Sequence, residues 1–89
     1  MSAAGTKRYL VLTLRNPDFD PAVIAPHYAH LDRLRAAGAL ELAGPFGDRS
    51  GGAYLLRAAD LATATTLAHA DPLHASGASR VSVHEWDAT

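Results

Sequence analysis

The sequence predicts an α+β fold with one antiparallel sheet and both of its helices on one face. Two observations lead to this prediction. Short apolar runs typical of strands occur four times, and two segments with helix signals lie between them. In chain order the elements are strand, helix, strand, strand, helix and strand. That order is typical of the split βαβ, or ferredoxin-like, arrangement, in which the helices cover one side of the sheet.

The first strand is expected over Arg8–Arg15, where β-branched, leucine and tyrosine residues lie between charged ends. The residues before it, Met1–Thr6, are small and polar, and we expect them to form a loose tail. The segment after it, Asn16-Pro17-Asp18, has the composition of a turn. The chain is therefore expected to leave the sheet before the first helix begins.

The first helix is expected between two boundary signals. Asp20 followed by Pro21 is a helix-start pair, and Gly38 is a natural residue to follow a helix. Pro26 does not fit a helix interior, because proline lacks the N–H donor. We therefore expect a short turn over Pro21–Ile24 and a main helix that has Pro26 in its first turn.

The second half of the chain is expected to form a hairpin, a helix and a last strand. Asp60 is a cap residue, and Asp71-Pro72 repeats the helix-start pair and predicts a short extra turn. The expected elements are a strand over Leu40–Phe46, a hairpin loop over Asp48–Gly52, a strand over Ala53–Arg57, a helix from about Leu61 to Ala70 and a strand over Arg80–Trp86.

The face of the sheet opposite the helices is expected to pair with a second copy of the chain. Alternation along the strands predicts that this face is too apolar to meet water. A symmetric dimer through the face would cover it and would bury most of Trp86. The residues expected there are Tyr9, Val11, Thr13, Tyr54, Leu56, His84 and Trp86.

The composition allows one small core. The chain has 89 residues and a mass of 9.3 kDa, which favours a single domain over residues 1–89. The hydrophobic fraction is 48%, but 19 of these residues are alanine, and Leu, Ile, Val and Phe together number only 19. Because large apolar side chains are so few, we expect an oligomer interface to supplement the core.

Several classes of protein are excluded by what the sequence lacks. No apolar run approaches the roughly 18 residues of a membrane span. No secretory signal precedes the first strand, so we expect a cytoplasmic protein. Cysteine is absent, which removes disulfides and thiolate metal sites. A formal net charge of −1, with Lys and Arg dispersed, argues against a nucleic-acid partner.

Residues far apart in the sequence are expected at one end of the fold. On a helical wheel His27 lies near the middle of the apolar stripe of the first helix, so it points at the sheet. Antiparallel connectivity places the start of this helix at the same end as Asp71, which follows the second helix. Gly44 and Pro45 close the second strand there. We expect these two residues and Tyr54 to line a small substrate pocket.

The predicted pair has the chemistry of an acid–base catalyst. An imidazole in the first turn of a helix feels the positive end of the helix dipole, which disfavours the protonated ring, and partial burial acts in the same direction. A neutral His27 suits a general base near neutral pH, and Asp71 within reach would fix its tautomer. We therefore expect the two side chains within hydrogen-bond distance, directly or through one water.

Other interpretations of the same residues are open. His27 alone could be a core histidine bonded to a carbonyl oxygen, and Asp71 alone could be a helix cap. His27 and His30 share one face of a helix, and with Asp71 or His74 as a third ligand they could hold zinc or iron. No phosphate loop or dinucleotide fingerprint is present. An acid–base enzyme with neither a cofactor nor a metal is one of the functions that these residues allow.

Five short segments, in order and over nearly the whole chain, resemble the YCII-related (YciI-like) family. The resemblance implies a dimeric α+β barrel, in which His27 and Asp71 match the family's proposed active-site histidine and aspartate. The position of His30 usually holds another residue type in this family, which weakens the metal interpretation. The segments are His27–Leu31, Gly38–Leu40, Ala43–Phe46, Ala70–Leu73 and Val81–Trp86.

Two classes of function follow. The first is a small enzyme in which the pair moves a proton. The few activities suggested for the family are lyase-like or dehalogenase-like steps on small, often aromatic, molecules. The second is a non-catalytic ligand-binding or assembly module built on the same dimeric barrel. In either class the expected partners are a small-molecule ligand and a second copy of the chain.

Overall fold

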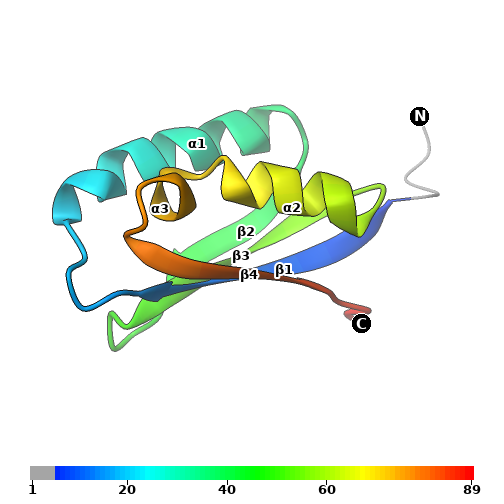
Figure 1. Cartoon of the computed structure of the whole chain (residues 1–89). Coiled ribbons are helices and arrows are strands. Elements are labelled where there is room, and N and C mark those ends of the chain that lie inside the picture. Colours follow the sequence, from blue (N-terminus) through cyan, green and yellow to red (C-terminus); the bar gives the residue numbers. More distant parts are fainter. Residues whose placement is uncertain (1–5) are drawn as a thin grey trace.

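The elements of the structure follow the predicted order (Figure 1). The computed structural model describes residues 6–89, so most of the expected loose tail, residues 1–5, lies outside the described residues. The elements are β1 (Lys7–Arg15), the 3₁₀ turn η1 (Pro21–Val23), α1 (Ile24–Ala36), β2 (Leu40–Pro45), β3 (Gly51–Ala58), α2 (Leu61–His69), α3 (Pro72–Ala75) and β4 (Ser79–Glu85).

The sheet is antiparallel throughout, with the strand order β2-β3-β1-β4. The helices α1 and α2 lie over the same face of it, and α3 follows α2 close to the start of α1 (Figure 1). This is the predicted ferredoxin-like arrangement. Because β2 is an edge strand, Pro45 can stand at its end without breaking an inner ladder.

The face of the sheet that meets the helices differs from the prediction. Both alternating sets of side chains in β1 are apolar, so alternation defines two faces without telling which one the helices cover. The buried positions of α2 are the small Ala64 and Ala68, so large side chains from the sheet fill the space beneath them. Five residues expected on the opposite face are therefore buried under the helices: Tyr9, Val11, Thr13, Tyr54 and Leu56.

The face of the sheet without helices, here called the open face, is also apolar. His84 pairs with Leu10 on this face, and Trp86 follows it by alternation, so the prediction is correct for these two residues. The side chain of Trp86 is 48% exposed in the single chain. The strand register places on the same face the leucines Leu10, Leu12, Leu14, Leu42 and Leu55.

The start of α1 is set by the residues that the sequence marks. Asp20 accepts a hydrogen bond from the Ala22 N–H at 2.9 Å and caps η1, which leads directly into α1. Pro26 lies in the first turn of α1, where no N–H donor is needed within the helix. His27 therefore lies in this first turn, as predicted. No helix within residues 6–89 is long and apolar enough to cross a membrane.

Gly51 allows β1 and β3 to approach closely at one end of the sheet. A Cβ atom on this residue would lie 1.8 Å from the carbonyl oxygen of Thr13, which no side chain can tolerate. The strand β3 consequently begins inside the predicted hairpin loop, because its two leading glycines pair with neighbouring strands.

Candidate active site

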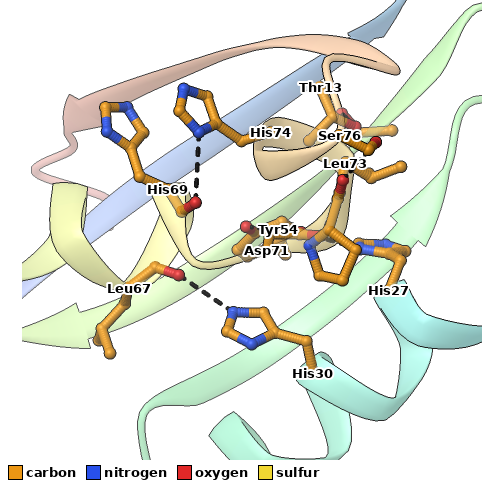
Figure 2. Close-up of polar contacts among 12 residues, drawn as sticks. Thr13, His27, His30, Tyr54, Leu67, His69, Asp71, Leu73, His74 and Ser76 are labelled. Atoms are coloured by element: carbon orange, nitrogen blue, oxygen red, sulfur yellow. Dashed lines mark hydrogen bonds and ion pairs between the residues drawn. The ribbon is translucent and has the colours of Figure 1, made fainter. Parts of the chain in front are cut away.

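His27 and Asp71 are in direct contact at the end of the sheet where α1 begins (Figure 2). The Nδ1 atom of His27 lies 2.9 Å from Oδ1 and 2.8 Å from Oδ2 of Asp71. The two residues are 44 positions apart in the sequence. Connectivity brings the first turn of α1 to the junction of α2 and α3, and the contact that the sequence predicts is present.

Asp71 is held by two further donors and is fully buried. Its Oδ2 accepts a hydrogen bond from the hydroxyl of Tyr54 at 3.0 Å, and its Oδ1 accepts one from the backbone N–H of Leu73 at 2.9 Å. The bond from Leu73 makes Asp71 the N-cap of α3. Asp71 is therefore both a helix cap and the partner of His27, two interpretations that the sequence presents as alternatives.

The surroundings of Asp71 keep its carboxylate charged. Burial acts to raise the pKa of Asp71, since it disfavours the ionised form. The hydrogen bonds from His27, Leu73 and Tyr54, together with the charge of His27, outweigh burial and hold the pKa of Asp71 below its ordinary value. Burial and the charge of Asp71 raise the pKa of Tyr54. At neutral pH the carboxylate is thus an acceptor and the phenol a donor.

A charged Asp71 fixes the tautomer of His27. A carboxylate can only accept, so Nδ1 carries the hydrogen in their shared bond. In the neutral ring Nε2 then holds the lone pair, and this atom has no hydrogen-bond partner among residues 6–89. The side chain of His27 is 14% exposed. The lone pair of Nε2 is therefore not used by any hydrogen bond within the described part of the chain.

The three residues predicted to bind substrate lie in different surroundings. Tyr54 is buried, and its hydroxyl faces Asp71 rather than an open hollow. Gly44 and Pro45 are exposed on the edge strand β2. None of the three lines the hollows described below. A substrate contact for Gly44 and Pro45 stays a prediction, and Tyr54 contacts the pair itself.

The other histidines of the region bind backbone carbonyls. His30 is buried, and its Nε2 lies 3.0 Å from the carbonyl oxygen of Leu67, which joins α1 to α2 (Figure 2). The Nδ1 of His74 lies 3.2 Å from the carbonyl oxygen of His69, and the two rings are stacked with their centroids 3.9 Å apart. Within residues 6–89, no group of three or more His, Cys, Asp or Glu is placed to share a metal ion.

A hollow of 50 Å³ lies next to the pair, between the end of the sheet, the start of α1 and α3. It is lined by Tyr28, which follows His27 in the chain, and by Leu73, whose N–H binds Asp71. The two residues of the pair line neither this hollow nor the larger one of 440 Å³ near the start of α1. The sequence predicts that His27 and Asp71 themselves line a pocket, whereas in the structure the nearby Tyr28 and Leu73 line it.

Ser79, at the start of β4, also lines the smaller hollow and is not among the site residues predicted from the sequence. Its Oγ is buried without a hydrogen-bond partner among residues 6–89. A signal was available, because alternation places this serine on the same side of β4 as Val81 and Val83, which pack against the core. A polar residue at such an inward position requires an explanation.

The chain is similar to proteins known from sequence. The family model described as the YCII-related domain matches residues 7–87. The uncharacterized protein YjpA of Bacillus subtilis (strain 168) is 47% identical over 78 residues, which are 88% of this chain and 92% of that protein.

The chain is also similar to proteins of known structure. The 5-chloro-2-hydroxyhydroquinone dehydrochlorinase TftG of Burkholderia phenoliruptrix AC1100, in complex with 2,5-dihydroxybenzoquinone, has a TM-score of 0.71 and 18% identity over 92% of this chain and 95% of that chain. A hydroxynitrile lyase from Passiflora edulis has a TM-score of 0.48 and 16% identity over 94% of this chain and 95% of that chain. The dehydrochlorinase and this chain have the same α+β fold.

Proposed function

The chain belongs to the YCII-related domain family, and we propose that it is a small-molecule enzyme in which His27 and Asp71 perform acid–base catalysis. The observation that carries the proposal is the contact of 2.8 Å between Nδ1 of His27 and the buried carboxylate of Asp71. A histidine oriented by a carboxylate, with its second nitrogen free, is a frequent general base.

In the proposed reaction Nε2 of His27 takes a proton from the substrate. The imidazolium that forms is stabilised by Asp71, whose charge lies at the other side of the ring. Tyr54 acts through Asp71 as a positioning residue, because its hydroxyl holds one carboxylate oxygen in place at 3.0 Å. No step of this chemistry needs a cofactor.

We propose an elimination of the lyase or dehalogenase type. When the base removes a proton, the electron pair left on the substrate forms a new double bond. The leaving group departs with the electron pair of its own bond, and the imidazolium returns its proton to solvent or to the product. The dehydrochlorinase of the same fold makes chlorinated hydroxyhydroquinones the first substrates to test, and small aromatic molecules the first class.

Release of chloride from 5-chloro-2-hydroxyhydroquinone tests the proposal. We expect chloride to be released from the substrate faster with the wild-type chain than in buffer without protein. His27→Gln should lower that rate by about 10²- to 10⁴-fold, because the proton acceptor is lost. Asp71→Asn should also lower the rate, since the amide still caps α3 but no longer fixes the tautomer of His27.

His69→Gln is the matched control, because it removes an exposed histidine at the end of α2, away from the open face of the sheet. It should leave the rate unchanged. Equal rates in the wild type and in His27→Gln, with both proteins folded by circular dichroism, would contradict acid–base catalysis by the pair on this substrate. If such a chain still bound the substrate, the non-catalytic ligand-binding module would be supported instead.

We also propose that two copies of the chain pair through the open face. The leucines of this face and the half-exposed Trp86 form an apolar surface that a second copy would remove from water. His84 and Trp86 are common to this face and to the set predicted from alternation, whereas leucines stand in place of the other five residues, so the face is apolar as predicted. Pairing of this kind would complete a dimeric α+β barrel.

A further inference from the structure

The hollow of 50 Å³ beside the pair has a mixed polar and apolar wall. The strands β1 and β4 contribute Thr13 and Ser79, and the helical side contributes Tyr28 and Leu73. A cavity needs roughly 10–15 Å³ to hold one water molecule, so this one has room for a few groups of that size. It is too small for an aromatic ring, but it suits a single polar substituent whose parent molecule lies outside.

Ser79 offers a hydroxyl to such a substituent. The residue is 5% exposed, and its Oγ has no partner among residues 6–89. The neighbouring hydroxyl of Thr13 is already used, because it donates to the carbonyl oxygen of Gly52 at 3.2 Å. A buried hydroxyl without a partner costs stability, and such groups in folded proteins are concentrated where a ligand or a water binds.

Arg15 supplies a positive charge at the same hollow. Its guanidinium lies over the ring of Phe19, 4.3 Å from the ring centroid, and both residues line the hollow. No carboxylate within residues 6–89 forms an ion pair with it. The charge is therefore held in place by stacking and is available to an anion, which a guanidinium binds through paired N–H donors.

We propose that this hollow binds an ionised oxygen of the substrate, a carboxylate or a phenolate, between the hydroxyl of Ser79 and the guanidinium of Arg15. The rest of the substrate would lie outside against Tyr28, which is 46% exposed and follows His27 in the chain. The inference deepens the proposed function, on which it rests for the role of His27, and it names the class of substrate as small organic anions.

Binding of simple anions tests the inference without any turnover. In an NMR titration at constant ionic strength, benzoate or 4-nitrophenolate should shift the backbone amide signals of Ser79, Leu73 and Gly51 in a saturable way. Neutral benzamide should not. Saturation by benzoate alone would identify the oxygen as a carboxylate, and saturation by 4-nitrophenolate alone as a phenolate. Equal shifts from benzamide and from both anions would overturn the inference.

Variants identify the two binding groups. Ser79→Ala should weaken anion binding by about tenfold, the effect of losing a hydrogen bond to a charged group. Arg15→Gln should weaken it several-fold. Arg33→Gln is the matched control, because it removes the same charge from an exposed position of α1 that does not line the hollow, and it should leave affinity unchanged. Equal losses in Arg15→Gln and Arg33→Gln would show nonspecific attraction and refute the site.

Thermal unfolding separates this role from a structural one. If Ser79 has no partner in the free protein, Ser79→Ala should raise the midpoint of unfolding, by roughly 4 °C or more. A lowered midpoint would mean that Oγ has a structural partner such as a bound water, and would overturn the inference. Chloride release that depends on His27 but not on Ser79 would leave the proposed function in place and reject only this anion site.

Discussion

Asp71 serves two structures at once. One carboxylate oxygen accepts a hydrogen bond from the backbone N–H of Leu73 at the start of α3, and the other accepts one from the hydroxyl of Tyr54. The Nδ1 atom of His27 contacts both oxygens. Three donors on one buried carboxylate explain why its pKa falls although burial alone would raise it. The geometry of the candidate site is thus built into a helix cap.

The raised pKa of Tyr54 predicts a loss of stability in alkaline solution. The phenol ionises near pH 10 in the unfolded chain, but its pKa is higher in the folded protein. Its contribution to stability is therefore complete below about pH 10 and declines as pH rises beyond that value. Urea unfolding should show the free energy of unfolding falling with a slope of up to about 1.4 kcal/mol per pH unit from this group.

Tyr54→Phe should make this alkaline slope shallower, because the variant has no phenol to ionise at that position. The same variant should have lower stability near neutral pH, since one oxygen of Asp71 loses its donor. Tyr28→Phe, at an exposed position on α1, controls for loss of a phenol. Identical slopes in the wild type and in Tyr54→Phe would show that Tyr54 does not keep its proton through this range.

The contact between His27 and Asp71 could be predicted because helical phase and connectivity determine it. The bond between Tyr54 and Asp71 could not, because alternation assigned Tyr54 to the wrong face of the sheet. Ser79 was not predicted because the expected strand began one residue later, at Arg80, which left the serine outside the alternating pattern of Val81 and Val83. Contacts that depend on which face is covered require the packed structure.

At the scale of elements, Gly51 holds the end of β3 against β1. Gly51→Ala would push a methyl group into the backbone of Thr13, where no flexible side chain can give way. We expect a loss of stability of at least about 1–3 kcal/mol in urea unfolding, the cost of a forced backbone shift. The hollow, which Gly51 also lines, should lose its shape.

Gly47→Ala is the matched control for this prediction, because a Cβ atom at Gly47 would meet nothing within 4 Å. Its stability should equal that of the wild type. Equal stability of the two variants would mean that β1 and β3 can separate at little cost.

The boundaries of the elements were predictable because local chemistry sets most of them. Asp20, Asp60 and Asp71 each cap the helix or turn that follows, through a side-chain bond to a backbone N–H. Gly38 ends α1 with a φ of +77°, a conformation that glycine adopts freely. These signals act over a few residues and therefore can be read without knowledge of the fold.

At the scale of the whole molecule, the open face predicts the state of association. Light scattering at micromolar concentration should show a dimer. Leu42→Asp should shift the mass toward the monomer, because it places a charge in the proposed interface. The side chain of Leu42 is 63% exposed in the single chain, so the substitution should not unfold the monomer. Ala62→Asp, at an exposed position of α2, is the control and should remain dimeric.

The sequence correctly predicts that the helices cover one face of the sheet. It assigns the wrong set of side chains from β1 to that face. The strand β1 alternates leucines with Tyr9, Val11 and Thr13, and hydrophobicity alone favours burying the leucines, whereas the structure buries the other set. Packing volume determines which face the helices cover, because the small alanines of α2 leave space that the tyrosines of the sheet fill. Complementary volume is a property of the assembled layers, and a single strand does not display it.

The separation of His27 and Asp71 by 44 positions also bears on how the chain acquires its chemistry during synthesis. When the ribosome has released only the first helix, its histidine has no carboxylate to orient it. Asp71 reaches His27 only after three further elements, β2, β3 and α2, have emerged and docked. A chain that ends before Asp71 therefore lacks the proposed acid–base pair, and any activity should appear only after α2 has docked on the sheet.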